Sequence, residues 1–131
     1  MLERLTQLEN NVSELSAFKK QHDLRAVQSS LQTQWTLRYG LFESIQIVVD
    51  IACHLSAKYN LGNPKMYSEC IELLTKHNYI KEPLAERLYS MVGLRNLLIH
   101  EYVEIDVEQL YSFLNYLDDF VVFAHAVKEY V

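Results

Sequence analysis

The chain has 131 residues, of which 50% are hydrophobic, with three glycines, two prolines and a formal net charge of −5. This length suits one domain, residues 1–131, that buries a core without a metal or disulfides, and so few glycines and prolines disfavour a β-sandwich or barrel with many turns. Residues 101–131 hold one lysine and seven acidic residues, a balance that disfavours the broad basic surface of a general DNA-binding protein, so no DNA partner is expected.

The first predicted element is an amphipathic helix over residues 2–18, where apolar side chains recur at steps of three and four. Asp23 suits the N-cap of a second helix, whose pattern continues over residues 24–58 without a proline. Gly40 lies inside this long helix. We expect it to let a neighbouring helix pack closely against its bare backbone, and we expect no break there.

Beyond Gly40 the long helix is apolar on nearly every side, which indicates that both of its faces are covered. One chain with four other helices barely supplies that cover, so we expect a homodimer in which a second subunit covers Ile47, Val49 and Ile51. Asp50 interrupts the apolar run, which is too short to cross a bilayer, so we expect a cytoplasmic protein with no membrane partner.

A polar stripe, formed by Glu43, Gln46, Asp50 and His54, follows the same helix at steps of three, four and four residues. Two interpretations of the polar stripe are open. Either it is a narrow strip that faces solvent, or its side chains, Glu43, Asp50 and His54 among them, line a functional cleft.

Three shorter helices complete the predicted set. One covers residues 66–77 after the loop NLGNPK, and the next begins near Pro83, which suits the first turn of a helix. The last covers residues 107–131, with Asp106 as its N-cap. The predicted fold is therefore all-α, an antiparallel bundle of about five helices.

The cysteines and histidines do not match the spacing of a metal site. Cys53 and Cys70 lie far apart in sequence, so we expect them to be small buried apolar residues in a reducing cytoplasm. The segment HEYVE begins like a zinc-protease motif, but Glu104 stands where the second histidine must be. We expect neither a metal nor a cofactor.

The segment MVGLRNLLIHEYVEID places Arg95, Asn96, His100 and Tyr102 close together at the end of an apolar helical pattern. In an ideal helix Arg95 and His100 point about 140° apart, so they converge only if the helix ends near His100 or if two copies of the motif meet across an interface. An arginine offers a fork of donors for a phosphoryl group, and a histidine moves a proton near neutral pH. Such a pair suits metal-independent cleavage of RNA by its own 2′-hydroxyl.

The spacing alone leaves a structural interpretation open. In that interpretation Arg95 pairs with a neighbouring helix, His100 is an ordinary residue at a helix C-terminus, and Tyr102 is an interface aromatic.

Arg95, His100 and Tyr102, with four residues and then one residue between them, resemble the signature of the HEPN superfamily in its HepT form. The flanking segments LAERLYSMVGLRNLLIHEYVEID, RYGLFESIQIVVDIACHL and NPKMYSECIELL are similar to that family as well. The resemblance implies a homodimeric helical bundle, the ribonuclease toxin of a type VII-like HepT/MntA toxin–antitoxin system. It also implies that Arg95 binds the phosphate, that His100 is the general acid and base, and that Asn96 orients one of them.

The resemblance further implies how such a toxin is controlled. A minimal nucleotidyltransferase antitoxin like MntA would transfer AMP from ATP onto Tyr102, and the added phosphate would compete with RNA for Arg95. Two other functions stay open, a non-catalytic helical partner or nucleotide-binding module of a nucleotidyltransferase, and a plain dimeric scaffold. A ribonuclease needs His100, whereas a docking module needs only its surface.

Overall fold

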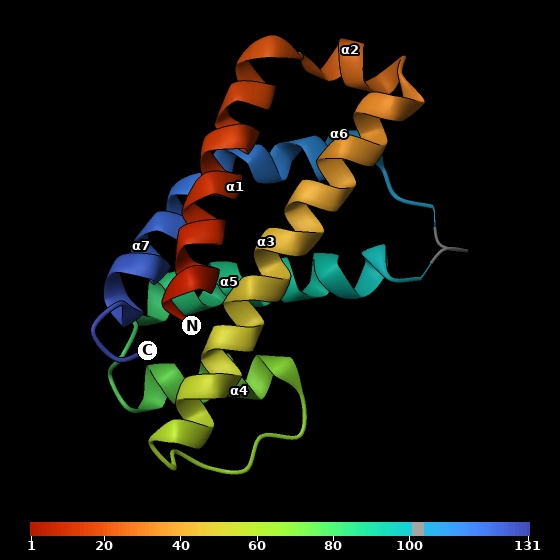
Figure 1. Cartoon of the computed structure of the whole chain (residues 1–131). Coiled ribbons are helices and arrows are strands. Elements are labelled where there is room, and N and C mark those ends of the chain that lie inside the picture. Colours follow the sequence, from red (N-terminus) through yellow and green to blue (C-terminus); the bar gives the residue numbers. More distant parts are fainter. Residues whose placement is uncertain (101–103) are drawn as a thin grey trace.

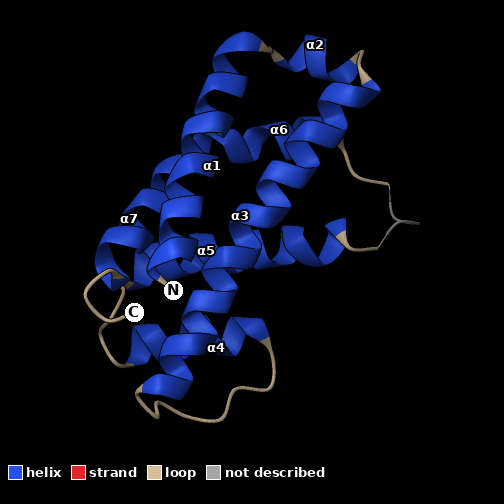
Figure 2. Cartoon of the chain, in the orientation of Figure 1, coloured by secondary structure: helices blue, strands red, loops and turns tan. Residues whose placement is uncertain are grey.

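The computed structural model describes residues 1–100 and 104–131, and this part of the chain is helical, with no strand (Figure 2). Its seven α-helices and one 3-10 helix are, in chain order, α1 (Leu2–Gln21), α2 (Leu24–Gln28), α3 (Leu31–Lys58), α4 (Tyr67–Lys76), α5 (Glu82–Leu98), α6 (Val107–Ser112), η1 (Phe113–Tyr116) and α7 (Leu117–Val127). The prediction of an all-α fold is confirmed.

The long helix α3 runs through the centre of the molecule, and α1 lies antiparallel to it (Figure 1). α5 crosses α3, and α4 packs against both of them. α6 contacts α2 and α3, whereas α7 contacts α1 and α5. The core between these helices is apolar and contains, among its largest fully buried side chains, Leu8, Leu37, Leu41, Ile45, Leu55, Ile71, Leu74, Leu88, Phe120 and Phe123.

Both predicted aspartate N-caps are confirmed. The Asp23 side chain accepts a hydrogen bond from the Ala26 N–H at the start of α2, and the Asp106 side chain accepts one from the Glu108 N–H at the start of α6. An acceptor at this position satisfies one of the N–H groups that a helix leaves unpaired at its beginning.

The prediction of one unbroken helix over residues 24–58 is wrong, because the chain leaves the helix at Ser29 and Ser30. The Ser30 side chain caps α3 by accepting a hydrogen bond from the Thr33 N–H at 3.3 Å. The Ser29 hydroxyl donates to the Arg25 carbonyl at 3.1 Å. Serine hydroxyls bond to nearby backbone groups and so compete with helical hydrogen bonding.

The predicted single helix over residues 107–131 is also interrupted. A 3-10 turn over Phe113–Tyr116 separates α6 from α7, and α7 ends at Val127. The change of direction lets α6 contact α2 while α7 contacts α1, so the two halves bury their apolar faces against different helices.

The close approach predicted at Gly40 is confirmed, since a Cβ atom there would lie 2.9 Å from Leu15 Cδ2 of α1.

The prediction of two separate reduced cysteines is wrong. Cys53 of α3 and Cys70 of α4 form a disulfide, with their Cα atoms 5.0 Å apart. Their separation in sequence hid this pairing, which depends on the packing of α4 against α3.

The prediction that a second subunit covers Ile47, Val49 and Ile51 is wrong. Each of these side chains is 0% exposed within the single chain. The neighbouring helices α1, α4 and α5 pack against α3.

α3 is long and apolar enough to cross a membrane by length and composition, a test that the buried core helix of a bundle also passes. In its most apolar stretch 56% of the helix is buried within the structure.

Candidate functional site

The end of α5 determines where the candidate catalytic residues lie. Pro83 occupies the first turn of this helix, which ends at Leu98, with Ile99 as its C-cap. His100 follows outside the helix as an exposed residue, and its backbone N–H donates to the Leu97 carbonyl at 3.2 Å. The predicted helix terminus near His100 is therefore confirmed, and the angle between positions 95 and 100 of an ideal helix does not apply to a residue outside the helix.

The Arg95 guanidinium is held by residues from three helices. Its Nε donates to the side-chain oxygen of Gln46 on α3 at 2.7 Å, and its Nη1 donates to the Asn96 side-chain oxygen at 3.0 Å. Its Cζ lies 4.6 Å from the ring centroid of Tyr67 on α4 and 5.7 Å from that of Phe42 on α3. Within the described residues Nη2 has no partner, so part of the donor fork is available to an anion.

A cavity of about 440 Å³ lies beside this guanidinium. We call it the Arg95 cavity, and it is lined by Lys65, Met66, Tyr67, Ser68, Val92, Arg95 and Asn96. Both charged side chains in this lining are cationic. Such a lining suits a phosphate group next to an aromatic surface.

The polar stripe of α3 faces two different neighbours. Gln46 binds Arg95 and also donates from Nε2 to Asp50 Oδ1 at 2.8 Å. Arg4 of α1 donates to Asp50 Oδ2 at 2.5 Å. Asp50, one of the residues predicted to line a cleft, is thus connected to Arg95 through the Gln46 side chain. The His54 side chain forms no hydrogen bond or ion pair with the described residues.

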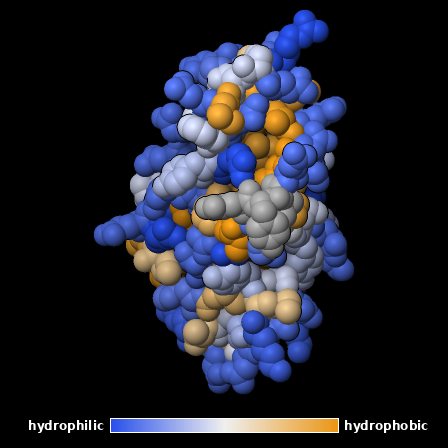
Figure 3. Space-filling model, turned by 90° about the vertical axis from the view of Figure 1, so that its right-hand side faces the viewer, coloured by the Kyte–Doolittle hydropathy of each residue, from blue (hydrophilic) through white to orange (hydrophobic). Residues whose placement is uncertain are grey.

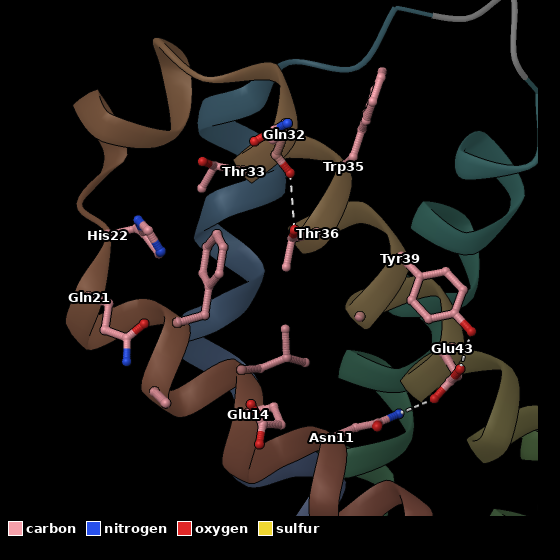
Figure 4. A pocket seen from close by; sticks show the side chains of 14 residues that line it. Asn11, Glu14, Gln21, His22, Gln32, Thr33, Trp35, Thr36, Tyr39 and Glu43 are labelled. Atoms are coloured by element: carbon pink, nitrogen blue, oxygen red, sulfur yellow. Dashed lines mark hydrogen bonds between the residues drawn. The ribbon is translucent and has the colours of Figure 1, made fainter.

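Glu43 lies at a separate cavity of about 780 Å³ between α1 and α3, which we call the Glu43 cavity (Figure 4). Its carboxylate accepts hydrogen bonds from Tyr39 Oη at 2.5 Å and from Asn11 and Gln7, both at 2.9 Å. The hydrogen bond from Tyr39, followed by that from Asn11, lowers the pKa of the Glu43 carboxyl. The same hydrogen bond and the Glu43 charge raise the pKa of the Tyr39 hydroxyl.

Three residues around Arg95 had no predicted role: Phe42, Lys65 and Tyr67. Gln46 alone carried a signal in the sequence, because it belongs to the polar stripe. Tyr102, predicted to carry the modification, lies outside the described residues. Among the described residues, no group of three histidine, cysteine, aspartate or glutamate side chains is arranged to hold a metal ion.

Comparisons with known proteins agree with this geometry. The family model of the ribonuclease HepT-like proteins matches residues 8–127. The chain is 30% identical to the mRNA nuclease HepT of Shewanella oneidensis, over 76% of this chain and 79% of that protein. It is 28% identical to the tRNA nuclease HepT of Aphanizomenon flos-aquae, over 66% of this chain and 59% of that protein.

The fold matches a solved structure of the tri-AMPylated Shewanella oneidensis HEPN toxin in complex with the MNT antitoxin. The TM-score is 0.88 at 24% identity, covering 98% of this chain and 96% of that chain. This likeness shows that the helices described above form the HEPN fold. The family match extends over nearly the whole chain, so the chain belongs to the HepT-like ribonuclease family.

Proposed function

We propose that this chain is the ribonuclease toxin of a toxin–antitoxin pair and that it cleaves RNA in the cytoplasm. The observation that supports this most is the Arg95 guanidinium, which is fixed by Gln46 and Asn96 yet keeps donors available, five residues before His100. Membership of the HepT-like family supports the same conclusion, since relatives of this chain are named as mRNA and tRNA nucleases.

In the proposed reaction, His100 accepts the proton of the RNA 2′-hydroxyl as that oxygen attacks the adjacent phosphorus. The bond from phosphorus to the 5′-oxygen breaks, and this oxygen leaves with the proton that His100 returns as general acid. The products are a 2′,3′-cyclic phosphate and a 5′-hydroxyl, and the chemistry needs no metal. Arg95 binds the phosphoryl oxygens, on which negative charge increases in the transition state, and Asn96 restricts its position.

The active form in this proposal is a homodimer in which the two copies of the motif face a common cleft. Its support is the exposure of apolar residues near the end of α5, where Leu97 is 39% exposed and Ile99 is 47% exposed. A second copy would cover these side chains and exclude water from the cleft.

The first prediction is that the purified protein cleaves RNA in EDTA and that Arg95→Ala and His100→Ala each lose this activity. The expected loss is at least about 100-fold, as for removal of a general base or of a transition-state donor. The measurement is the rate of cleavage of a labelled RNA, with mass spectrometry of the new 3′ ends. Arg25→Ala and His125→Ala are matched controls, because both side chains are exposed on other helices.

Equal cleavage by the wild type and both site variants would contradict the proposed catalysis. It would favour the interpretation as a non-catalytic partner of a nucleotidyltransferase.

The second prediction concerns control of the toxin. We propose that an MntA-like antitoxin transfers AMP from ATP onto Tyr102, so that the tyrosine oxygen bonds to the α-phosphorus and pyrophosphate leaves. The related Shewanella oneidensis toxin is described as tri-AMPylated. We expect the co-expressed protein to gain multiples of one AMP mass on the Tyr102 peptide, because this phosphate would compete with RNA for Arg95.

Tyr102→Phe is expected to stay folded and to escape neutralisation, whereas Tyr116→Phe, at an exposed tyrosine of η1, is expected to be neutralised like the wild type. Full neutralisation with an unmodified Tyr102 peptide would mean that the partner acts by binding alone.

A further inference from the structure

A continuous series of hydrogen bonds connects Arg95 to the first turns of the N-terminal helix. Arg95 Nε donates to Gln46 Oε1 at 2.7 Å, and Gln46 Nε2 donates to Asp50 Oδ1 at 2.8 Å. Arg4 Nη2 then donates to the other oxygen of Asp50 at 2.5 Å. The four side chains come from α5, α3 and α1, and all of them are half-buried.

We propose that Gln46 is a positioning residue for Arg95, and that Asp50 and Arg4 fix the direction in which the Gln46 amide points. This inference rests on the proposed ribonuclease function and adds a residue to its site. Gln46 touches Arg95 and not the reacting atoms in this proposal, so it acts through the arginine.

The direction of the amide follows from what its two neighbours can do. An arginine donates hydrogen bonds and cannot accept them, whereas a carboxylate accepts and cannot donate. Asp50 therefore attracts the amide nitrogen of Gln46, which turns the amide oxygen toward Arg95. Arg4 stabilises the Asp50 carboxylate at this half-buried position.

The hydrogen bond to Gln46 determines which N–H groups of Arg95 can bind the substrate. Because Nε is bonded to Gln46, a phosphate has to bind the N–H groups of Nη1 and Nη2. Gln46 is also neutral, so it holds the guanidinium without compensating its positive charge. A carboxylate at this position would hold Arg95 equally well but would compete with the phosphate for that charge.

The test compares Gln46→Leu and Gln46→Glu with the wild type, and Gln109→Leu serves as the control at an exposed glutamine of α6. Gln46→Leu should lower kcat/KM for RNA cleavage by about 10- to 100-fold, which corresponds to loss of one charge-assisted hydrogen bond. Gln46→Glu should lower it at least as much. The pH profile of the remaining activity should keep its shape, because His100 is unchanged.

A spectroscopic measurement separates this inference from the proposed function. The Nε–H signal of Arg95 in ¹H–¹⁵N NMR should move in Gln46→Leu and stay in place in Gln109→Leu, and the Gln46 variant should bind inorganic phosphate more weakly. These two observations do not need cleavage, so a wild type without ribonuclease activity would contradict the proposed function and still leave the positioning role measurable.

Two results would overturn the positioning role. One is an unchanged Arg95 Nε–H signal in Gln46→Leu. The other is full activity in Gln46→Leu, since this variant removes the acceptor for Arg95 Nε. Full activity in Gln46→Glu would contradict only the argument that the residue at this position has to be neutral.

Discussion

Glu43 accepts hydrogen bonds from three side chains. These bonds predict how the stability of the folded protein changes at acidic pH. The hydrogen bond from Tyr39 is the largest cause that lowers the pKa of Glu43 in the folded protein. A lowered folded pKa means that the stabilisation is fully present above the unfolded pKa and is lost as the pH falls through the folded pKa. The third prediction is therefore that Glu43→Gln costs stability at pH 6 and costs much less at pH 3.

Urea unfolding of the wild type and of Glu43→Gln at both pH values measures this difference. Glu14→Gln is the control, because Glu14 lines the same Glu43 cavity without accepting a hydrogen bond from the described residues. A cost of Glu43→Gln that is the same at pH 6 and pH 3 would contradict the prediction.

At the residue scale, the sequence indicated the candidate catalytic residues of α5 but not the side chains from other helices that contact them. Arg95, Asn96 and His100 follow one another along the chain, so their spacing could be evaluated without a structure. Gln46 and Tyr67 reach Arg95 from other helices. Their contacts depend on how α3, α4 and α5 rotate about their own axes when they pack, and periodicity does not determine that rotation.

At the scale of the elements, the helices were predictable where a capping residue and the apolar pattern agreed. Asp23 and Asp106 begin helices as predicted. The break at Ser29 and Ser30 was missed because the apolar pattern continues across it. The interruption by η1 (Phe113–Tyr116) was missed for a different reason, since it depends on which helices α6 and α7 contact.

The fourth prediction concerns two glycines in helices with opposite surroundings. A Cβ atom at Gly93 of α5 would meet nothing within 4 Å, whereas one at Gly40 of α3 would lie 2.9 Å from Leu15 Cδ2. Gly93→Ala should therefore raise the free energy of unfolding by about 1 kcal/mol, the difference in helix propensity between glycine and alanine. Gly40→Ala should gain less, because buried Leu15 has to move.

Urea unfolding of both variants at one protein concentration tests the comparison. A Gly40→Ala protein that is as stable as Gly93→Ala, or more stable, would show that Leu15 moves without cost.

At the scale of the whole molecule, the formal charge of −5 has to be reconciled with the proposed RNA substrate. The two charged side chains that line the Arg95 cavity are Lys65 and Arg95. A local cationic site of this kind can bind one phosphate on a protein that is acidic overall. Such a protein gains little from the long-range attraction that leads a basic protein to bind any nucleic acid.

The predicted homodimer also belongs to the scale of the whole molecule. The sequence predicted a second subunit from side chains that the single chain already buries. One group of exposed apolar residues lies at the N-terminal half of α3 and the end of α5, where Trp35 is 57%, Tyr39 is 66% and Ile99 is 47% exposed. This face contains a groove of about 330 Å³, lined by Trp35, Arg38, Tyr39, Phe42, Leu98 and Ile99. Figure 3 shows hydrophobic side chains in orange gathered on one face of the molecule, between hydrophilic ones in blue.

The fifth prediction is that this groove is part of the interface between two copies of the chain. Phe42 lines the groove and also lies 5.7 Å from the Arg95 Cζ, so the apolar face is continuous with the proposed catalytic site. Trp35→Glu should convert the dimer to a monomer, because a charge at the interface has to be desolvated. It should also lower RNA cleavage, since the proposed active form places both copies of the motif at one cleft.

Sedimentation at micromolar concentration and RNA cleavage by the same samples test this together. Val122→Glu is the control, since Val122 is 51% exposed on α7, outside the groove. A wild-type protein that sediments as a monomer and still cleaves RNA would show that one copy of Arg95 and His100 is sufficient. The groove around Trp35 would then be expected to bind a different protein, because large exposed apolar patches mark interaction sites.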